Sequence, residues 1–358
     1  MIKKFDEVFV DKTRLGKKIP KEEYKKKGKY IIIDQGKDKI AGFTDNEDGI
    51  FTDVPTIIFG DHTRIIKYID KPFFLGADGV KVLKSKINNA NYKYLYYALK
   101  AAYIPNTGYN RHFKWLKKVS INYPSFEKQK RIVKLLDNLS EVKNKKNEEL
   151  KLCDTLIKAR FVEMFGDLKF DTPVSKYIES LTAGKSLAGK EKCTNKVLNT
   201  GAVSYDKFKN DYKYLPSNYV PDENNKVRTG NVLISRMNTQ ELVGATAYVW
   251  EAPENTYLPD RLWRANLKEN VNSIFLWQVL IHPLLKLQIQ RVSSGTSGSM
   301  KNISKSNFLK LKVPDVNEES QNKFASFVQQ VDKSKVAIQK SLDETQILFD
   351  SLMQKYFS

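Results

Sequence analysis

The stretch LIKARFVEMF, residues Leu156–Phe165, has a counterpart in LFDSLMQKYF, residues Leu348–Phe357, which lies 192 residues further along the chain. The same shift aligns a series of apolar positions ahead of these stretches: Leu150 with Leu342, Leu139 with Val331, Leu136 with Val328, and Ile132 with Phe324. Self-similarity at a fixed shift indicates that one structural plan is used more than once. We therefore expect two copies of one arrangement in this 358-residue chain.

The repeated stretches end long segments that lack both glycine and proline, as helices do. Each segment begins directly after a proline, and the next residue is suited to capping a helix: Ser125 after Pro124 in the first copy, and Asp315 after Pro314 in the second. We therefore expect two long helices, within residues 124–166 and 314–358. At about 1.5 Å per residue, 40 residues form a rod of about 60 Å.

Apolar residues in both segments recur at the three- and four-residue steps of a coiled-coil seam. The residues expected to pair the helices are Leu139, Val142, Leu150, Cys153 and Ile157 in the first copy, and Val331, Ile338, Leu342, Phe349 and Leu352 in the second. Each stripe could instead pack on a globular body. Because two matching stripes occur in one chain, we favour mutual pairing as an antiparallel coiled coil.

The regions before each long helix have a different pattern. Residues 1–123 contain the strand-like runs KYIIID, PTIIFGD and GVKVL, and residues 167–313 contain GNVLISRM and VGATAYVW, all bounded by turn signals. NYKYLYYALKAAY and SIFLWQVLIHPLLKLQIQRV are the helical candidates. The expected fold class is α/β in the mixed α+β sense, with two domains of similar plan (1–123 and 167–313) separated by the long helices (124–166 and 314–358).

Positive charge is concentrated at equivalent places in the two copies. The chain carries 61 basic and 41 acidic residues, a formal net charge of +20. Residues 79–126 contain nine Lys or Arg and no acidic residue, and residues 271–314 contain six and again none. Solvated surface lysines would explain the net charge alone equally well, but duplicated acid-free segments favour a nucleic-acid partner.

Two segments within these basic regions are candidates for contacting DNA: NTGYNRHFKWLKK (106–118), and its counterpart SSGTSGSMKNIS (293–304). Arg and Lys neutralise phosphates, whereas Asn, Ser and Thr can address base edges or the backbone. For Phe113 and Trp115 we favour a role in the core over stacking on bases. The candidate DNA-binding residues are Thr107, Tyr109, Asn110, Arg111, His112, Lys114, Lys117, Lys118, Arg236, Arg264, Ser294, Thr296, Ser297, Ser299 and Lys301.

Motifs for catalysis are missing from the sequence. SSGTSGSMK lacks the Gly-Lys-Ser/Thr of a phosphate-binding loop, no Asn/Asp-Pro-Pro-Tyr motif of an adenine methyltransferase occurs, and the three histidines have no metal-ligand spacing. Two cysteines and the lack of a long apolar run indicate a cytoplasmic protein without a membrane segment. We expect no catalytic or metal-binding residues. The rival hypotheses are a nuclease with an unrecognised site, and a coiled-coil scaffold without a DNA role.

Longer stretches complete the pattern. They are GKYIIIDQGKDKIAGFTD, PTIIFGDHTRIIKYIDKPFFLGADGVKVL, YNRHFKWLK and YPSFEKQKRIVKLLD in the first copy, and GNVLISRMNTQELVGATAYV, LPDRLWRA, SSGTSGSMKNIS and VPDVNEESQNKF in the second. In their order and duplication they resemble the specificity (S) subunit of type I restriction-modification systems, over essentially the whole chain. One departure concerns the second helix, since two extra residues separate Pro314 from Gln321 compared with Pro124 and Gln129. Its first residue is therefore left open.

The resemblance implies a non-catalytic DNA-recognition subunit. Each domain would be a target recognition domain that reads one half of a bipartite double-stranded DNA target, and the helices would set the spacing and dock the modification (methyltransferase) subunits. Those subunits would use S-adenosylmethionine to methylate adenine, and a separate restriction subunit would use ATP and Mg²⁺. The resemblance implies no cofactor bound by this chain itself.

Overall fold

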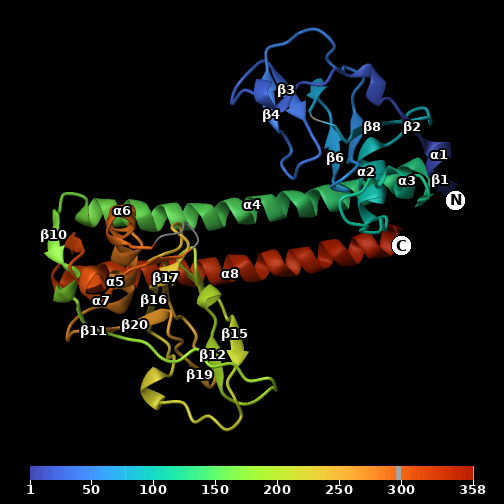
Figure 1. The fold of residues 1–358 in the computed structure, drawn as a ribbon. Coiled ribbons are helices and arrows are strands. Elements are labelled where there is room, and N and C mark those ends of the chain that lie inside the picture. The colour runs from blue at the N-terminus through green and yellow to red at the C-terminus, as the bar shows by residue number, and fades with distance from the viewer. Residues whose placement is uncertain (77, 296–299, 358) are drawn as a thin grey trace. The chain divides into compact units, whose positions relative to one another are not determined.

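The computed structural model describes residues 1–76, 78–295 and 300–357 (Figure 1). The chain forms two compact units. The first unit comprises residues 1–149 and 338–358, and the second comprises residues 150–337. Each unit therefore contains one mixed domain together with a part of each long helix, and the four-segment division of the sequence stays a prediction.

Two small sheets form the domain of the first unit. The four-stranded antiparallel sheet has the order β2 (Phe9–Asp11), β8 (Val80–Ser85), β5 (Thr56–Gly60), β6 (Ile66–Ile69). The three-stranded sheet has the order β4 (Gly42–Thr44), β3 (Tyr30–Ile33), β7 (Phe73–Leu75), with β3 and β7 parallel. The remaining elements are β1 (Ile2–Lys4) paired with β9 (Ser120–Asn122), α1 (Phe5–Val8), α2 (Tyr92–Ala101), α3 (Phe113–Leu116), and the 3₁₀ turns Thr13–Leu15 and Lys21–Glu23.

The second unit repeats this plan. Its four-stranded sheet has the order β11 (Ile178–Thr182), β20 (Leu262–Leu267), β16 (Val232–Ser235), β18 (Thr246–Tyr248), and its three-stranded sheet the order β15 (Tyr212–Tyr214), β12 (Lys196–Leu198), β19 (Thr256–Tyr257). β10 (Phe170–Pro173) pairs with β22 (Lys312–Pro314) as β1 does with β9. The remaining elements are β13 (Val203–Ser204) with β14 (Lys207–Phe208), β17 (Met237–Asn238) with β21 (Lys301–Asn302), α5 (Ser273–Leu280), α6 (Pro283–Val292), α7 (Lys305–Leu309), and the 3₁₀ turns Val174–Lys176, Thr200–Ala202 and Glu223–Asn225.

The expected strand runs and helices are confirmed, with one difference. The helical candidate at 273–292 is two helices, α5 and α6, because Pro283 cannot continue α5 and instead occupies the first turn of α6. No helix in the described residues combines the length and apolar character that crossing a membrane requires.

The long helices are α4 (Phe126–Phe165) and α8 (Glu318–Phe357), so their first and last residues are related by the 192-residue shift. A buried glutamine marks the start of each helix. The side-chain Nε2 of Gln129 donates to the Pro124 carbonyl at 2.9 Å, and that of Gln321 donates to the Val316 carbonyl at 2.9 Å. The two extra residues of the second copy therefore lie before α8.

The expectation that Asp315 caps the second helix is wrong. Because α8 begins at Glu318, Asn317 occupies the capping position, and its Oδ1 accepts a hydrogen bond from the Ser320 N–H at 2.9 Å. The Asp315 carboxylate instead forms an ion pair with Lys176.

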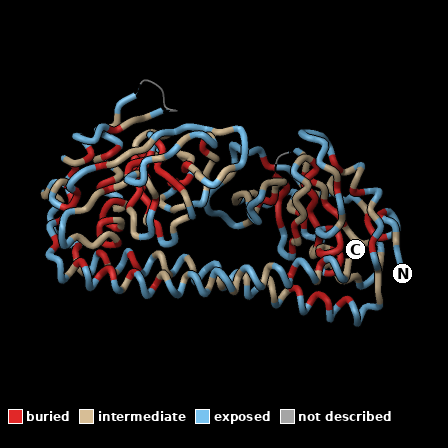
Figure 2. Tube along the Cα trace, turned by 90° about the horizontal axis from the view of Figure 1, so that it is seen from below, coloured by how far each residue is buried: buried red, intermediate tan, exposed pale blue. Residues whose placement is uncertain are grey.

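The helices pack antiparallel within each unit. In the first unit the start of α4 and the end of α8 share a core that includes Leu136 and Phe349. In the second unit the end of α4 and the start of α8 share a core that includes Phe161 and Phe324. Figure 2 shows that buried residues lie towards the ends of the long helices, whereas the middle stretches are intermediate or exposed. Antiparallel packing of the two helices is thus confirmed unit by unit.

The expected pairing residues differ in their burial. Ile157, Val331 and Phe349 are core residues, Leu139, Cys153 and Leu352 pack at the edges of these cores, and Leu150, Ile338 and Leu342 are half-buried. Val142 is 39% exposed, so it is no seam residue. The adjacent Lys143 turns inward instead, with its Nζ 4.9 Å from the centre of the Phe349 ring.

Candidate nucleic-acid interface

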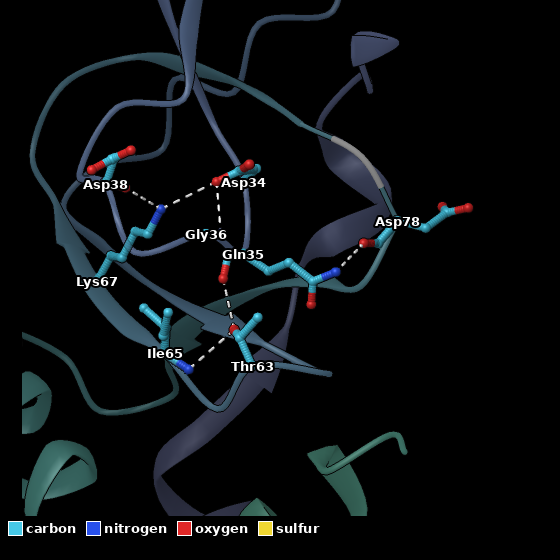
Figure 3. Close-up of polar contacts among 8 residues, drawn as sticks. All are labelled: Asp34, Gln35, Gly36, Asp38, Thr63, Ile65, Lys67 and Asp78. Atoms are coloured by element: carbon cyan, nitrogen blue, oxygen red, sulfur yellow. Dashed lines mark hydrogen bonds and ion pairs between the residues drawn. The ribbon is translucent and has the colours of Figure 1, made fainter. Parts of the chain in front are cut away.

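Gln35 connects three loops of the first unit (Figure 3). It follows β3, and its side-chain Nε2 donates to the Asp78 carbonyl at 3.0 Å while its Oε1 accepts from the His62 N–H at 3.1 Å. Its own carbonyl accepts from the Thr63 hydroxyl at 2.6 Å. The loops after β3, after β5 and before β8 are therefore fixed against one another by one side chain and its backbone.

Lys67 of β6 stabilises the loop after β3, which belongs to this loop cluster. Its buried Nζ lies 2.6 Å from the Asp38 carbonyl and 3.4 Å from Asp34 Oδ1, which also accepts from the Gly36 N–H (Figure 3). Burial lowers the pKa of Lys67, and the Asp34 carboxylate opposes this shift. Because its ammonium group is buried and bonded within the unit, Lys67 holds the loop after β3 and is not a phosphate ligand.

Asp61 attaches the basic segment 106–118 to the same loops. Its backbone N–H donates to the Gly79 carbonyl at 2.7 Å, and its own carbonyl accepts from the His112 N–H at 2.8 Å. Its buried carboxylate accepts from the Phe113 N–H at 2.7 Å. The His112 ring is fully buried, with Nδ1 3.0 Å from the Asp61 carbonyl oxygen, so the expectation that His112 contacts DNA is corrected: the ring has no surface to present.

The other candidates in this segment are exposed, namely Thr107, Tyr109, Asn110, Arg111, Lys114, Lys117 and Lys118. Tyr109 is 89% exposed and stacks on His62, with ring centroids 4.9 Å apart. An exposed ring held in this way can stack on a base or a sugar.

Phe113 and Trp115 are partly buried against the core of the first unit, which confirms that they serve packing. They also organise the neighbouring lysines. Lys114 and Lys118 place their Nζ atoms 5.6 and 4.8 Å from the centre of the Trp115 ring, and Lys117 lies 5.2 Å from that of Phe113. The three ammonium groups are therefore grouped beside the loop cluster, in reach of a polyanion.

The second unit has the same backbone connections at the equivalent place. The Arg236 N–H donates to the Arg261 carbonyl, and the Arg236 carbonyl accepts from the Ile303 N–H, both at 3.1 Å. Arg236 thus takes the position of Asp61, and Ile303 that of His112. The described parts of segment 293–304, Ser293–Gly295 and Met300–Ser304, therefore are the structural counterpart of the loop that ends at His112, as the position of the segment in the repeat predicts.

The structure brings three second-unit candidates to this loop cluster. Arg236 directly precedes β17, Lys301 lies in β21 beside it, and the exposed Ser294 bridges to Asn302. Lys301 Nζ donates to the Gly295 carbonyl at 2.9 Å. Thr296, Ser297 and Ser299 lie outside the described residues.

Arg264 is not part of this cluster. It lies within β20, where its Nε donates to Asn266 Oδ1 at 3.1 Å and a terminal nitrogen lies 3.4 Å from the Lys226 carbonyl oxygen. Burial lowers the pKa of its guanidinium group. Its guanidinium group is therefore bonded within the unit, away from the loop cluster. The guanidinium carbon of Arg236, by contrast, lies 5.8 Å from the centre of the Trp263 ring.

Buried polar atoms without a hydrogen bond occur in both loop clusters. Within the described residues, His62 Nδ1 in the first unit, and Arg236 Nε and Asn302 Oδ1 in the second, have none. Such atoms are costly in a folded protein, and a bound group or a water molecule could complete their bonding. Both loop clusters are therefore candidate ligand-binding surfaces.

Sequence reasoning missed Gln35, Asp61 and His62 as organisers of the loops. The available signal was the glycines around them. Gly79 has a φ of +90°, and a Cβ there would lie 2.8 Å from His62 Cδ2. No metal-binding group of three His, Cys, Asp or Glu side chains is found in the described part of the chain.

Two copies of one mixed domain, each with a loop cluster to which a basic segment is attached, are typical of a protein that recognises a polyanion at two places. The sequence model of the family described as "Type I restriction modification DNA specificity domain" matches residues 1–152 and 181–346. The chain therefore belongs to the type I restriction-modification DNA specificity family, and it is a DNA-recognition subunit.

Solved structures show the same fold. The type I restriction-modification S subunit from M. genitalium is 18% identical and superimposes with a TM-score of 0.66, over 100% of this chain and 96% of that one. A chain from a structure describing complex assembly and conformational transition of the type I system is 16% identical, with a TM-score of 0.54 over 100% and 97% of the two chains. No curated protein sequence matches the chain.

Proposed function

We propose that each unit of this DNA-recognition subunit reads one half of a bipartite double-stranded target. The observation that carries the proposal is the duplicated loop cluster, in which Asp61 and Arg236 make the same backbone connections in the two units. The side chains around these connections differ, with His62 and Tyr109 in one unit and Arg236 and Lys301 in the other. One framework with different side chains would read two different half-sites.

The long helices would set the spacing of the half-sites and dock the modification subunits. Each is one uninterrupted helix of 40 residues that contributes to both units, as a spacer requires. Exposed apolar side chains on both helices support docking of a partner: Leu152, Leu156 and Val162 on α4, and Val336, Ile347 and Leu348 on α8.

Catalysis would then reside in other subunits. In this proposal the modification subunits bind S-adenosylmethionine and methylate adenine, a restriction subunit uses ATP and Mg²⁺, and the present chain binds no cofactor. The assembled complex would act on DNA in the cytoplasm. The proposal rests on membership of the specificity family rather than on any catalytic group in this chain.

Methylome sequencing tests this function. The chain is co-expressed with its modification subunits in a host without DNA methyltransferases, and a single methylated motif with two specified parts and an unspecified gap is expected. Absence of DNA binding by the complex at low salt would favour the scaffold hypothesis. Metal-dependent cleavage by the purified chain alone would establish the nuclease hypothesis.

A further inference from the structure

The two units share a pair of aromatic rings where the four-stranded sheet meets its covering helix. In the first unit Tyr68 of β6 lies opposite Ile57 of β5, and in the second Tyr248 of β18 lies opposite Val232 of β16. Tyr96 and Trp277 each follow the capping asparagine of their helix by five residues. The ring centroids are 6.4 Å apart for Tyr68 and Tyr96, and 5.9 Å apart for Tyr248 and Trp277.

The first unit covers its ring pair with lysines of its own. Lys93 Nζ lies 5.9 Å from the centre of the Tyr68 ring and 2.6 Å from an Asp137 carboxylate oxygen. Lys100 Nζ lies 5.7 Å from the centre of the Tyr96 ring and equally far from that of Phe349. The electron-rich faces of Tyr68 and Tyr96 thus already interact with cations of the same unit.

The second unit lacks both lysines. Counted from the capping asparagine, Ile274 takes the place of Lys93 and Ile281 that of Lys100. A third ring is added, since Trp250 lies 4.6 Å from Tyr248 and 6.1 Å from Trp277 between ring centroids. Among the described residues no Lys or Arg lies over any of these three rings, which line a pocket of about 990 Å³.

A carboxylate that forms no ion pair in the described residues lines the same pocket. Asp332 of α8 is half-buried and makes no ion pair or hydrogen bond within the described residues, and burial raises the pKa of its carboxyl group, with Lys335 opposing. Two other carboxylates of the pocket are already paired, Asp154 with Lys335 at 2.7 Å and Asp206 with Lys286 at 2.6 Å.

The remaining charges at the pocket do not neutralise Asp332. Lys158 and Lys207 line the pocket but are exposed, so their ammonium groups can remain in water, and the carboxylate of Glu251 is exposed as well. A pocket lined by both an aromatic wall and a partly desolvated carboxylate suits a flat cation on an apolar stem. A guanidinium group meets both conditions, because it stacks on aromatic rings and pairs with a carboxylate through two hydrogen bonds.

We propose that this pocket of the second unit binds an arginine side chain of a protein docked along the long helices. Its guanidinium group lies against the rings of Tyr248, Trp250 and Trp277 and pairs with Asp332. A protein is the expected source because α4 and α8 both line the pocket, and Val162 at its edge is 60% exposed. The partner class, a modification subunit, rests on the proposed function, whereas the cation site does not.

The cation site is tested on the full chain labelled with 5-fluorotryptophan, whose four tryptophans are Trp115, Trp250, Trp263 and Trp277. Titration with Nα-acetyl-arginine amide is expected to shift the ¹⁹F signals of Trp250 and Trp277 saturably and to leave Trp115 unchanged. The citrulline counterpart has the same shape without the charge, and its affinity should be lower by about tenfold or more. Equal shifts with citrulline, or no shift with arginine amide, would overturn the site.

Substitution separates the site from its partner. Asp332→Asn should weaken arginine amide binding about tenfold, whereas Asp343→Asn, the same change elsewhere on α8, should leave it unchanged. In assembly titrations D332N should also weaken binding of the modification subunits about tenfold relative to D343N. If the wild-type chain bound arginine amide but D332N assembled normally with the modification subunits, the modification subunit would be refuted as the partner. If a wild-type complex bound arginine amide but did not bind DNA, the proposed function would be refuted and the cation site would stand.

Discussion

Gln35 shows how much of the first loop cluster depends on one side chain. Its amide joins loops that lie 27 and 43 residues away along the chain, through the His62 N–H and the Asp78 carbonyl. The sequence predicts that segment 106–118 carries charge for DNA, because the charge is visible locally. Gln35 could not be found in this way, since its partners are set by the sheet topology.

Replacing Gln35 with alanine should therefore impair reading of the first half-site. Two hydrogen bonds are lost, so affinity of the complex for its target is expected to fall about tenfold, while affinity for random DNA, which depends on phosphate contacts, changes less than about twofold. Fluorescence anisotropy with target and random duplexes measures both. Gln339→Ala on the exposed side of α8 is the control, and an equal loss on both duplexes would contradict a positioning role.

The lysines around Trp115 carry a prediction about charge. Replacing Lys114, Lys117 and Lys118 with glutamine should weaken DNA binding and lower the slope of log affinity against log salt by up to about 2.7, since each phosphate contact contributes about 0.9. The matched control replaces Lys323, Lys333 and Lys340, three exposed lysines of α8. If the slopes of the two triple variants agreed, net charge rather than a local contact would explain the binding.

At the scale of elements, the duplicated glutamines allow a direct comparison. Gln129 and Gln321 each bond a carbonyl before their helix, but Gln321 also accepts from the Asn272 N–H at 3.1 Å, whereas Gln129 Oε1 has no hydrogen bond within the described residues. Gln321→Leu should therefore lower the free energy of unfolding by about 2 kcal/mol and Gln129→Leu by about 1 kcal/mol or less. Urea denaturation of both variants measures this, and the reverse order would contradict the account.

His282 makes the stability of the second unit depend on pH. Its ring lies between Phe161 and Phe170, and burial lowers its pKa below the ordinary value of 6.5. The unfolded chain therefore binds this proton more readily than the folded unit does, and stability is lost as the pH falls through 6.5 towards the lower folded-state pKa.

The test compares thermal unfolding at pH 7.5 and pH 5.5 for the wild type and His282→Asn. The wild type should lose more stability on acidification, because asparagine can keep the helix cap but cannot titrate. The variant is expected to be less stable at pH 7.5, by about 1 kcal/mol, because the ring contacts are lost. An equal response to pH in both proteins would exclude His282 as the cause.

The elements themselves were largely predictable. The long helices follow from uninterrupted periodicity, and the strands from short apolar runs between turns, because both signals are local. The first residue of α8 was not predictable, since the choice between Asp315 and Asn317 depends on where Gln321 finds the Val316 carbonyl. Lys143 takes the inward position next to Val142 for a similar reason, because the Phe349 ring offers a cation site that no local pattern reveals.

For the whole molecule, the repeat predicts two domains of one plan but not how the chain divides. In the second unit the end of α4, a domain and the start of α8 follow in chain order, whereas the first unit joins residues 1–149 to the end of α8. The two units therefore share one plan of a domain and two helix segments, but these parts follow in a different order along the chain. A sequence comparison at a fixed shift cannot show this, because it aligns segments and not the contacts that close each unit.

The central claim is that the paired helices set the distance between the two half-sites. It is tested by lengthening both helices at the boundary between the two units. Four residues are inserted after Glu149 in α4 and four after Ala337 in α8, which leaves each unit intact and adds about 6 Å. Methylome sequencing of the complex should then show both half-sites unchanged and a gap that is longer by one or two base pairs, at about 3.4 Å each. An active complex that methylates the original gap would contradict the claim.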